Sequence, residues 1–221
     1  MLTLVKDNTI NLIEIFSSVQ GETHLSGLPT VFVRTAACNL RCTWCDTNYS
    51  FGRGTPTTID SIVKEVEEAG LPHVCITGGE PLLQKNIHQL MSILCDRGYT
   101  VSIETGGSLP INNIDARVIT ILDIKCPGSG MESKNLWENI KNLRPHDEIK
   151  FVILDRNDYD YTKKVIEKYH LKNRKHPVLL SPVHDELESK QLVEWILEDK
   201  LPVRLNLQLH KFIWTPQTRG V

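Results

Sequence analysis

Short runs of apolar and β-branched residues recur along the chain and predict β-strands. Several runs are apolar almost throughout, which is typical of parallel strands covered on both faces. We expect the first run at an edge of the sheet. The predicted strands are Asn11–Phe16, Thr30–Thr35, His73–Thr77, Thr100–Thr105, Val118–Ile124, Glu148–Leu154, Pro177–Leu180 and Val203–Leu209.

Helical periodicity fills several of the gaps between these strands. Between Ile59 and Ala69, apolar residues follow the i, i+3, i+4, i+7 spacing, Thr57 and Asp60 resemble a capping pair, and Gly70 suits a C-terminal cap. The alternation indicates an α/β protein, either an α/β barrel or a doubly wound sheet. Similar patterns predict helices over Ile87–Leu94, Tyr159–Leu171 and Glu186–Glu198.

Glycine, charged residues and histidine follow most of the predicted strands. Parallel α/β proteins bind ligands at the carboxyl ends of their strands, where successive loops converge. We therefore expect these motifs to form one rim. They are CNLRCTWCDT (38–47), TGGEP (77–81), ETGG (104–107), DIKCPGSG (123–130), SPVH (181–184) and QLHK (208–211).

Length and charge restrict the class of protein. The 221 residues, 40% of them hydrophobic, suit a single domain spanning 1–221. A formal net charge of -2 argues against nucleic acid as a partner. The apolar start is broken at Lys6 and Asp7, and no run reaches the roughly 20 apolar residues that a membrane span needs. We expect a cytoplasmic protein without a membrane partner.

Three of the six cysteines, Cys38, Cys42 and Cys45, lie within eight residues. In a reducing compartment such a group favours a metal or catalytic site, whereas Cys75 and Cys95 suit small buried positions. A structural zinc site is closed by four protein ligands, and no further Cys or His lies close enough in sequence. Two interpretations remain: a four-iron cluster with one open iron, or zinc completed by a distant ligand.

The Cys-x3-Cys-x2-Cys spacing resembles the signature of radical S-adenosylmethionine (SAM) enzymes. The segment TGGEP resembles the second motif of those enzymes, where backbone at Gly78 and Gly79 receives the amino group of SAM. This resemblance implies a 4Fe-4S cluster on the three cysteines, with SAM chelating the fourth iron. Reductive cleavage of SAM then yields a radical that abstracts hydrogen from the substrate.

A narrower resemblance covers nearly the whole chain. The segments IFSSVQGE, FVRTAACNLRCTWCDT, TGGEPLLQ, IETGGS and LHKFIWTPQTRGV are similar to those of 7-carboxy-7-deazaguanine synthases. The resemblance implies a partial TIM-like β/α barrel with a reduced helix complement. It also implies conversion of 6-carboxy-5,6,7,8-tetrahydropterin to 7-carboxy-7-deazaguanine with loss of ammonia, with Mg2+ required, SAM regenerated, a homodimer, and an electron donor such as flavodoxin or ferredoxin.

The resemblance also implies a role for particular residues. Arg34 offers a guanidinium for a substrate carboxylate, and Thr47 offers magnesium a hard oxygen ligand. The implied substrate residues are Val19, Gln20, Gly21, Arg34, Thr77, His210 and Pro216. The implied SAM residues are Trp44, Cys45, Asp46, Gly79, Asp123, Ile124, Lys125, Ser181, Pro182, Val183 and His184.

The chain departs from the family pattern at three places. Thr23 stands where Gln-Gly-Glu-Gly has its last glycine, so we expect this loop to avoid conformations that only glycine tolerates. Asp123 and Ile124 replace a more usual Ser-Pro pair, and the chain continues past Pro216 through Gln217–Val221.

Two other functions are alternatives. The first is an activase that generates a glycyl radical on a partner protein, which predicts an open rim and little need for Arg34, Thr47 or His210. The second is a zinc-stabilised binding domain without catalysis.

Overall fold

A single nine-stranded sheet organises the chain in the computed structural model, which describes residues 8–215 and 218–220. Its strand order is β3-β1-β2-β4-β5-β6-β7-β8-β9. Strand β1 is antiparallel to both of its neighbours, and every other adjacent pair is parallel. The strands are β1 (Thr9–Val19), β2 (Pro29–Thr35), β3 (Thr55–Thr58), β4 (His73–Gly78), β5 (Thr100–Thr105), β6 (Ile119–Ile124), β7 (Glu148–Ile153), β8 (Val178–Pro182) and β9 (Val203–Leu205).

The predicted edge position of the first strand is wrong. Strand β3 pairs with β1 over Thr9 to Leu12 and forms the edge instead. Its sequence, TPTT, is short, polar and contains proline, which is the composition of an edge strand and gives little hydrophobic signal. The last strand also ends earlier than predicted, at Leu205.

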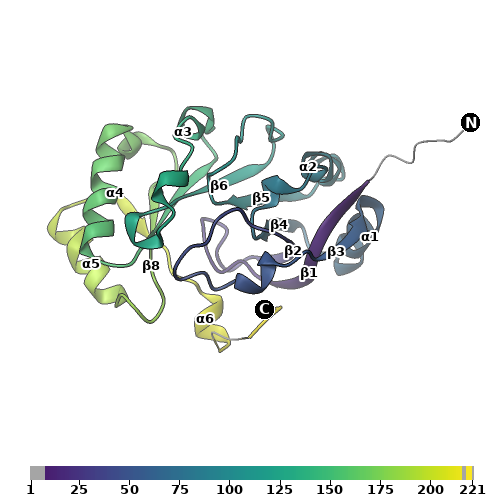
Figure 1. Cartoon of the computed structure of the whole chain (residues 1–221), viewed down its shortest axis with the longest axis horizontal. Coiled ribbons are helices and arrows are strands. Elements are labelled where there is room, and N and C mark those ends of the chain that lie inside the picture. Colours follow the sequence, from purple (N-terminus) through teal and green to yellow (C-terminus); the bar gives the residue numbers. More distant parts are fainter. Residues whose placement is uncertain (1–7, 216–217, 221) are drawn as a thin grey trace, which may run out of the picture.

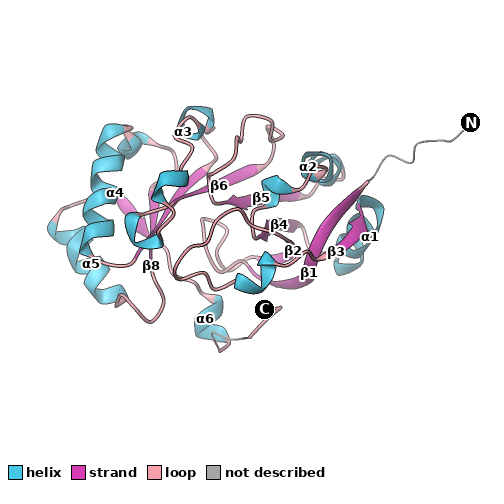
Figure 2. Ribbon diagram, in the orientation of Figure 1, coloured by secondary structure: helices cyan, strands magenta, loops and turns pink. Residues whose placement is uncertain are grey.

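The helices pack along the outside of the sheet (Figure 2), where α1 contacts β1, α2 contacts β5 and α4 contacts β7. Helix α1 begins after Thr58, whose side chain accepts a hydrogen bond from the Ser61 N–H, so the predicted cap at Thr57 is wrong by one residue. Gly70 ends this helix at φ 65°, as predicted. The α-helices are α1 (Ile59–Ala69), α2 (Ile87–Asp96), α3 (Asn139–Asn142), α4 (Arg156–Lys168), α5 (Ser189–Glu198) and α6 (His210–Ile213); short 3-10 helices cover Asn48–Phe51, Pro81–Leu83, Pro127–Ser129, Glu132–Lys134 and Leu171–Asn173.

The sheet is curved but not closed, since β3 and β9 are its two unpaired edges (Figure 1). The loop between β1 and β2, residues 20–28, spans part of this opening. The Thr23 N–H donates to Asn206 Oδ1 (2.8 Å), just beyond β9, and Glu22 bonds to Lys150 Nζ (2.8 Å) on β7. The partial barrel with few helices is therefore confirmed.

One continuous hydrophobic core lies between the sheet and the helices. Tyr159 on α4 is fully buried and donates its hydroxyl to the carbonyl of Trp195 on α5 (2.9 Å). Cys75 is buried in β4 as predicted, whereas Cys95 is only half-buried on α2. In the described part of the chain, no helix combines the length and apolar character needed to cross a bilayer.

Candidate functional site

The cysteine loop leaves β2 at its carboxyl end and is anchored by the loop around 3-10 helix 127–129. The Thr43 N–H donates to Ser129 O (3.2 Å), and the Thr43 hydroxyl donates to Gly128 O (2.9 Å). Both contacts fall between Cys42 and Cys45, so they shape the backbone that carries the second and third thiols. The loop therefore has a fixed conformation from protein contacts alone.

The three thiols are free and half-buried. Partial burial is the main cause that raises the pKa of Cys38, Cys42 and Cys45, and each pKa is raised further by the charge of another of the three. The thiols are thus close enough to interact. Thiolate donors of this kind prefer zinc, copper(I) or iron–sulfur clusters.

The donor set fits an iron–sulfur cluster. Cys38, Cys42 and Cys45 present three half-buried thiols on one short loop, and thiolates are soft ligands of the kind that iron–sulfur clusters prefer. A structural zinc site is closed by four protein ligands, whereas three thiolates can hold a four-iron cluster with one iron left open.

The TGGEP turn lies directly against the cysteine loop. A Cβ atom at Gly79 would collide with the carbonyl oxygen of Ala37, the residue before Cys38, so only glycine fits there. Gly78 has φ 138°, a value that side chains rarely adopt. The two loops also share a hydrogen bond from Glu80 N–H to Ala37 O (2.8 Å).

Glu80 holds the rim together with a fully buried carboxyl group. Its oxygens accept hydrogen bonds from the Thr105 hydroxyl (2.9 Å), the Gly106 N–H (2.8 Å) and the Leu82 N–H (3.1 Å). Burial raises the pKa of this carboxyl, although these hydrogen bonds act against the shift. The glutamate of TGGEP is thus a cross-link between the loops after β4 and β5.

Lys125 and Asp123 bring the carboxyl end of β6 to the cluster loop. Lys125 Nζ lies 3.1 Å from Asp123 Oδ2, and its charge opposes the burial that raises the pKa of the Cys42 thiol. Asn135 fixes the Lys125 backbone by donating to its carbonyl (2.8 Å) and accepting from its N–H (2.9 Å). Ile124 belongs to the hydrophobic core, so only its backbone faces the rim.

A buried charge network occupies the barrel interior. Lys150 Nζ lies 2.8 Å from Glu22 Oε2 and 3.6 Å from Asp123 Oδ2. Burial opposes ionisation of Glu22, but Lys150 prevails and lowers its pKa, and the same partners raise the pKa of Lys150 well above its usual value. Glu104 lies beside them and is partly exposed; it accepts the Thr77 hydroxyl (3.0 Å) and has a pKa raised by desolvation. The two carboxyl groups in the interior therefore have pKa values shifted in opposite directions. The ammonium group of Lys150 lowers the pKa of Glu22, whereas the pKa of Glu104 is raised.

Gln20, Gly21 and His210 meet where the loop 20–28 touches α6. The Leu209 N–H donates to Gly21 O (2.9 Å), and a Cβ at Gly21 would collide with the His210 ring. Burial lowers the pKa of His210. The predicted strand Val203–Leu209 placed His210 directly after a strand; this is wrong, because the chain leaves the sheet at Leu205 and His210 begins α6.

Thr23 corrects the expectation for the loop 20–28. Its φ is 68°, in the left-handed region that β-branched residues avoid. The strain is held by the bond from its N–H to Asn206 Oδ1 (2.8 Å) and by the Leu25 N–H, which donates to its hydroxyl (3.1 Å). This chain thus keeps the glycine-like conformation without the glycine.

Arg34 lies near the end of β2 and is oriented by its neighbours. Its Nε–H donates to Glu14 Oε1 (2.7 Å), and its guanidinium lies over the Phe16 ring (5.4 Å to the centroid). Within the described residues, its terminal nitrogens have no hydrogen-bond partner. Two forked donors are thus free to bind a carboxylate.

Asp46 and Thr47 form a second polar group behind Cys45. The Thr47 hydroxyl donates to Asp46 Oδ1 (2.8 Å), while Gln208 Nε2 (3.2 Å) and Lys211 Nζ (3.3 Å) bond to Asp46 Oδ2. Although desolvation opposes ionisation, Lys211 and these hydrogen bonds lower the pKa of Asp46 to about 2. Two hard oxygens are thus adjacent here.

The segment from Ser181 to His184 lies farther along the sheet. Ser181 is buried and accepts a hydrogen bond from Asn206 Nδ2 (2.8 Å), and Val183 is buried as well. Pro182 and His184 line a cavity of about 230 Å³ with Gln208. Val19 ends β1, Trp44 is half-buried within the cysteine loop, and Pro216 lies outside the described residues.

Lys150, Asn206 and Gln208 are interior polar residues to which the sequence patterns assign no role. The Asn206 and Gln208 side-chain amides donate to the two oxygens of Glu22 (3.2 and 3.0 Å). A lysine inside the apolar strand EIKFVI was a detectable signal, because lysine is rarely buried without a partner. The amides gave no comparable signal, since they are ordinary in a loop.

The fold and the cysteine loop define a radical SAM enzyme. In agreement, the Radical SAM superfamily matches residues 32–122 of the chain. Membership implies a 4Fe-4S cluster and SAM as cofactors, a small-molecule substrate and a source of electrons.

Curated relatives narrow the class. The chain is 44% identical to the 7-carboxy-7-deazaguanine synthase of Koribacter versatilis, over 96% of this chain and 100% of that protein. It is also 44% identical to the enzyme of that name from Chlorobaculum tepidum, over 96% and 97% of the two chains. The crystal structure of QueE from Escherichia coli has the same fold, with a TM-score of 0.75 at 20% identity over 90% of this chain and 94% of that one. The chain belongs to the 7-carboxy-7-deazaguanine synthase family, and the expected resemblance is confirmed.

Proposed function

We propose that the protein converts 6-carboxy-5,6,7,8-tetrahydropterin to 7-carboxy-7-deazaguanine with loss of ammonia, a step in 7-deazapurine biosynthesis leading to queuosine. The observation that carries this proposal is the polar interior beside the cysteine loop, where Gln20, Glu22, Glu104 and His210 converge. A pterin is a flat heterocycle edged with N–H donors and nitrogen and oxygen acceptors. A group of carboxyl, amide and imidazole side chains complements such an edge.

The substrate residues then divide the work. Arg34 binds the substrate carboxylate through the terminal nitrogens of its guanidinium group. The edge of the pterin ring is bound by Gln20, the Gly21 backbone, Thr77 and His210. Val19 and Pro216 complete the pocket from the two ends of the chain. Glu104, supported by Thr77 and Lys150, accepts a ring N–H and excludes water from the interior.

The cofactor residues lie along the rim. When bound, the cluster and SAM supply the radical that abstracts a substrate hydrogen. We assign SAM binding to the rim segments in three groups: Trp44, Cys45, Asp46 and Gly79; Asp123, the Ile124 backbone and Lys125; and Ser181, Pro182, Val183 and His184. Lys125 supports this assignment because its ammonium lies among the cysteine thiols and Asp123.

We assign magnesium to Thr47. Its hydroxyl and the neighbouring carboxylate of Asp46 are hard oxygens, and magnesium combines a few such ligands with water and substrate oxygens. In Thr47→Ala we expect turnover to lose most of its dependence on added Mg2+. Thr57→Ala on the exposed edge strand is the matched control. Unchanged magnesium dependence in Thr47→Ala would refute the assignment.

The family resemblance also suggests the oligomeric state, the electron donor and the cellular location of the protein. We infer a homodimer of one-domain chains spanning 1–221, reduced by a flavodoxin or ferredoxin in the cytoplasm, without a nucleic-acid or membrane partner. The single hydrophobic core supports the one-domain assignment. The net charge of -2 supports the absence of a nucleic-acid partner.

Anaerobic turnover tests the proposed reaction. Reconstituted protein should form the deazaguanine product from carboxytetrahydropterin with SAM, reductant and magnesium, and Arg34→Ala should raise KM strongly. Arg53→Ala, on the loop before β3, is the matched control. Cleavage of SAM without any deazaguanine would reject the proposed substrate while leaving the radical SAM class intact.

A further inference from the structure

Two histidines and a glutamate gather at the opposite end of the barrel from the cysteine loop. Glu148 is the first residue of β7, His176 comes two residues before β8, and His24 lies in the loop 20–28. These positions are at the amino ends of the parallel strands, whereas the cysteine loop follows a carboxyl end. The cluster is therefore separate from the proposed cofactor site.

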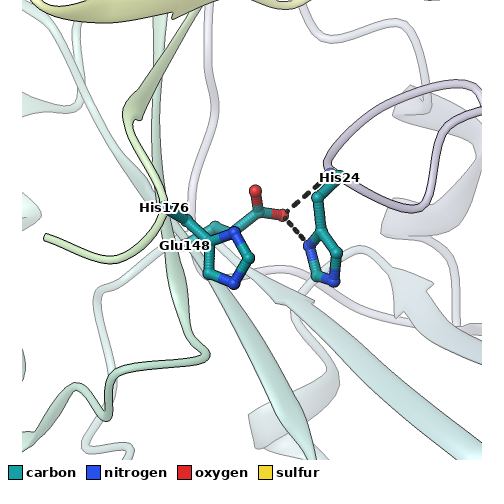
Figure 3. Close-up of side chains that lie close together, drawn as sticks. All are labelled: His24, Glu148 and His176. Carbon is teal, nitrogen blue, oxygen red and sulfur yellow. Dashed lines mark hydrogen bonds and ion pairs between the residues drawn. The ribbon is translucent and has the colours of Figure 1, made fainter.

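The three side chains are close and mutually facing (Figure 3). Their ligand atoms, one from each residue, all lie within 4.8 Å of one another. His24 Nδ1 is 2.9 Å from Glu148 Oε2, and the rings of His24 and His176 are stacked with centroids 4.6 Å apart. Among the described residues, this is the one group of three His, Cys, Asp or Glu side chains that is so compact.

Glu148 is the unusual member because its side chain is only 1% exposed. Among the described residues its carboxyl contacts come from His24 alone, through the imidazole and the backbone N–H (3.2 Å). A buried carboxylate is costly unless a cation compensates it. The nearby lysine of β7, Lys150, is committed to Glu22 and Asp123.

The imidazoles are suited to bind a metal. Neutral imidazole nitrogens coordinate metals, and each ring brings one such nitrogen to the cluster. Both rings are half-buried, which leaves a route for an ion. Two imidazole nitrogens and one carboxylate oxygen are the protein ligands of many open zinc sites.

We propose that His24, Glu148 and His176 form a zinc site, with water as the fourth ligand. Zinc bonds of about 2.0–2.2 Å to nitrogen and oxygen require ligand atoms about 3.3 Å apart. The ligand atoms, which now lie within 4.8 Å of one another, would therefore have to approach on binding, by rotation of the two imidazole side chains out of their stack.

The site would fasten the loop that carries the proposed substrate residues. Glu148 and Lys150 are two positions apart on β7 and so share one face of the strand. Lys150 bonds to Glu22 and Glu148 bonds to His24, which are also two positions apart. Bound zinc adds a second, stronger tie between the loop 20–28 and β7.

Zinc titration of the cluster-loaded protein tests the proposal. The three cysteines are occupied by iron in that form and do not compete. We expect one tightly bound zinc, and a Tm rise of about 5–10 °C when free zinc is a hundredfold above Kd. Cobalt as a second probe should give a tetrahedral spectrum with nitrogen and oxygen ligands and without thiolate character.

Matched variants identify the ligands without testing turnover. His176→Phe keeps an aromatic ring beside His24 but removes the ligand nitrogen, and we expect zinc affinity to fall more than about tenfold. We expect the same loss of zinc affinity in Glu148→Gln, because the amide replaces the carboxylate ligand. His146→Ala is the control, since His146 is paired with Asp147 (3.6 Å) but has no second histidine.

Two results would overturn the proposal. One is the absence of zinc binding by the cluster-loaded wild-type protein, which would reduce the group to an ion pair between Glu148 and His24. The other is zinc affinity unchanged in His176→Phe. Because affinity and Tm are measured without substrate, neither result depends on the proposed reaction.

Discussion

Glu80 at the rim and Glu22 in the interior are both buried, but their pKa values are shifted in opposite directions. Glu80 at the rim is surrounded by hydroxyl and N–H donors, and burial raises its pKa. Glu22 in the interior faces Lys150, and its pKa is lowered. At the rim, uncharged hydroxyl and N–H donors to Glu80 connect the loops after β4 and β5. In the interior, the ammonium group of Lys150 keeps Glu22 ionised. The same side chain thus serves structure in one region and a binding environment in the other.

The glycines show the same contrast. At the rim, Gly79 is packed against a backbone carbonyl, which cannot move without distorting the cysteine loop. In the interior, Gly21 is packed against the ring of His210, which can rotate. The rim is therefore the more rigid of the two regions.

Removing the interior ammonium should have the largest effect. Lys150→Met leaves Glu22, Glu104 and Asp123 in one buried space without their shared cation, and we expect a loss of about 3–5 kcal/mol in the free energy of unfolding. Urea unfolding followed by circular dichroism measures it. Lys141→Met, whose side chain is 71% exposed, is the control. A loss no larger than that of the control would mean that the interior charges are not coupled.

Substitution of the two glycines by alanine should have different effects: Gly79→Ala on iron incorporation and Gly21→Ala on turnover. Gly79→Ala displaces the cysteine loop, so we expect little iron to be incorporated. Gly21→Ala should keep its iron but lose about a hundredfold in turnover, because His210 is displaced by roughly 1 Å. Gly52→Ala, where a Cβ would make only an ordinary van der Waals contact with the Tyr49 carbonyl oxygen (3.9 Å), is the control. Full iron content in Gly79→Ala would contradict the rigid rim.

Removing the hydrogen bonds from the uncharged Thr105 hydroxyl to Glu80 should lower the free energy of unfolding less than removing the charge of Lys150. Thr105→Val removes the hydroxyl that donates to both oxygens of Glu80, and we expect a loss of about 1–3 kcal/mol in the free energy of unfolding. Thr57→Val, on the exposed edge strand, should cost little. If Thr105→Val matched Lys150→Met, the distinction between the two regions would disappear.

The contributions of Glu80 and Glu22 to stability should depend on pH with opposite signs. Glu80 has a raised pKa, so its contribution to stability is present at low pH and is lost as pH rises from 4.5 through the folded-state pKa. Glu22 has a lowered pKa, so its contribution is present above pH 4.5 and is lost as pH falls. Tm measured against pH for Glu80→Gln and Glu22→Gln checks this. Parallel profiles would show that burial alone determines both groups.

The sheet and the rim could be predicted from the sequence because they depend on local patterns. Apolar runs placed the parallel strands, and the motif positions placed the cysteines, Gly79 and Lys125 at one rim. Strand β3 was missed because TPTT is short and polar, and β9 was predicted too long because the alternation VRLNLQL continues after Leu205, where the chain leaves the sheet.

The interior could be predicted only in part. Glu22 and Lys150 are 128 residues apart, and nothing in either segment specifies the other. Thr23 shows a different limit, because its left-handed backbone is imposed by the distant Asn206 against its own preference. Contacts of this kind are fixed by tertiary structure and not by the local sequence.

The opening between β3 and β9 has a mechanical consequence. The segment 20–28 that spans part of it carries two of the proposed substrate residues, Gln20 and Gly21, and is attached to its surroundings through polar contacts at Glu22, Thr23 and His24. Displacement of this segment would break these contacts and move the proposed substrate residues at the same time. Entry and retention of the proposed substrate would then depend on this one segment.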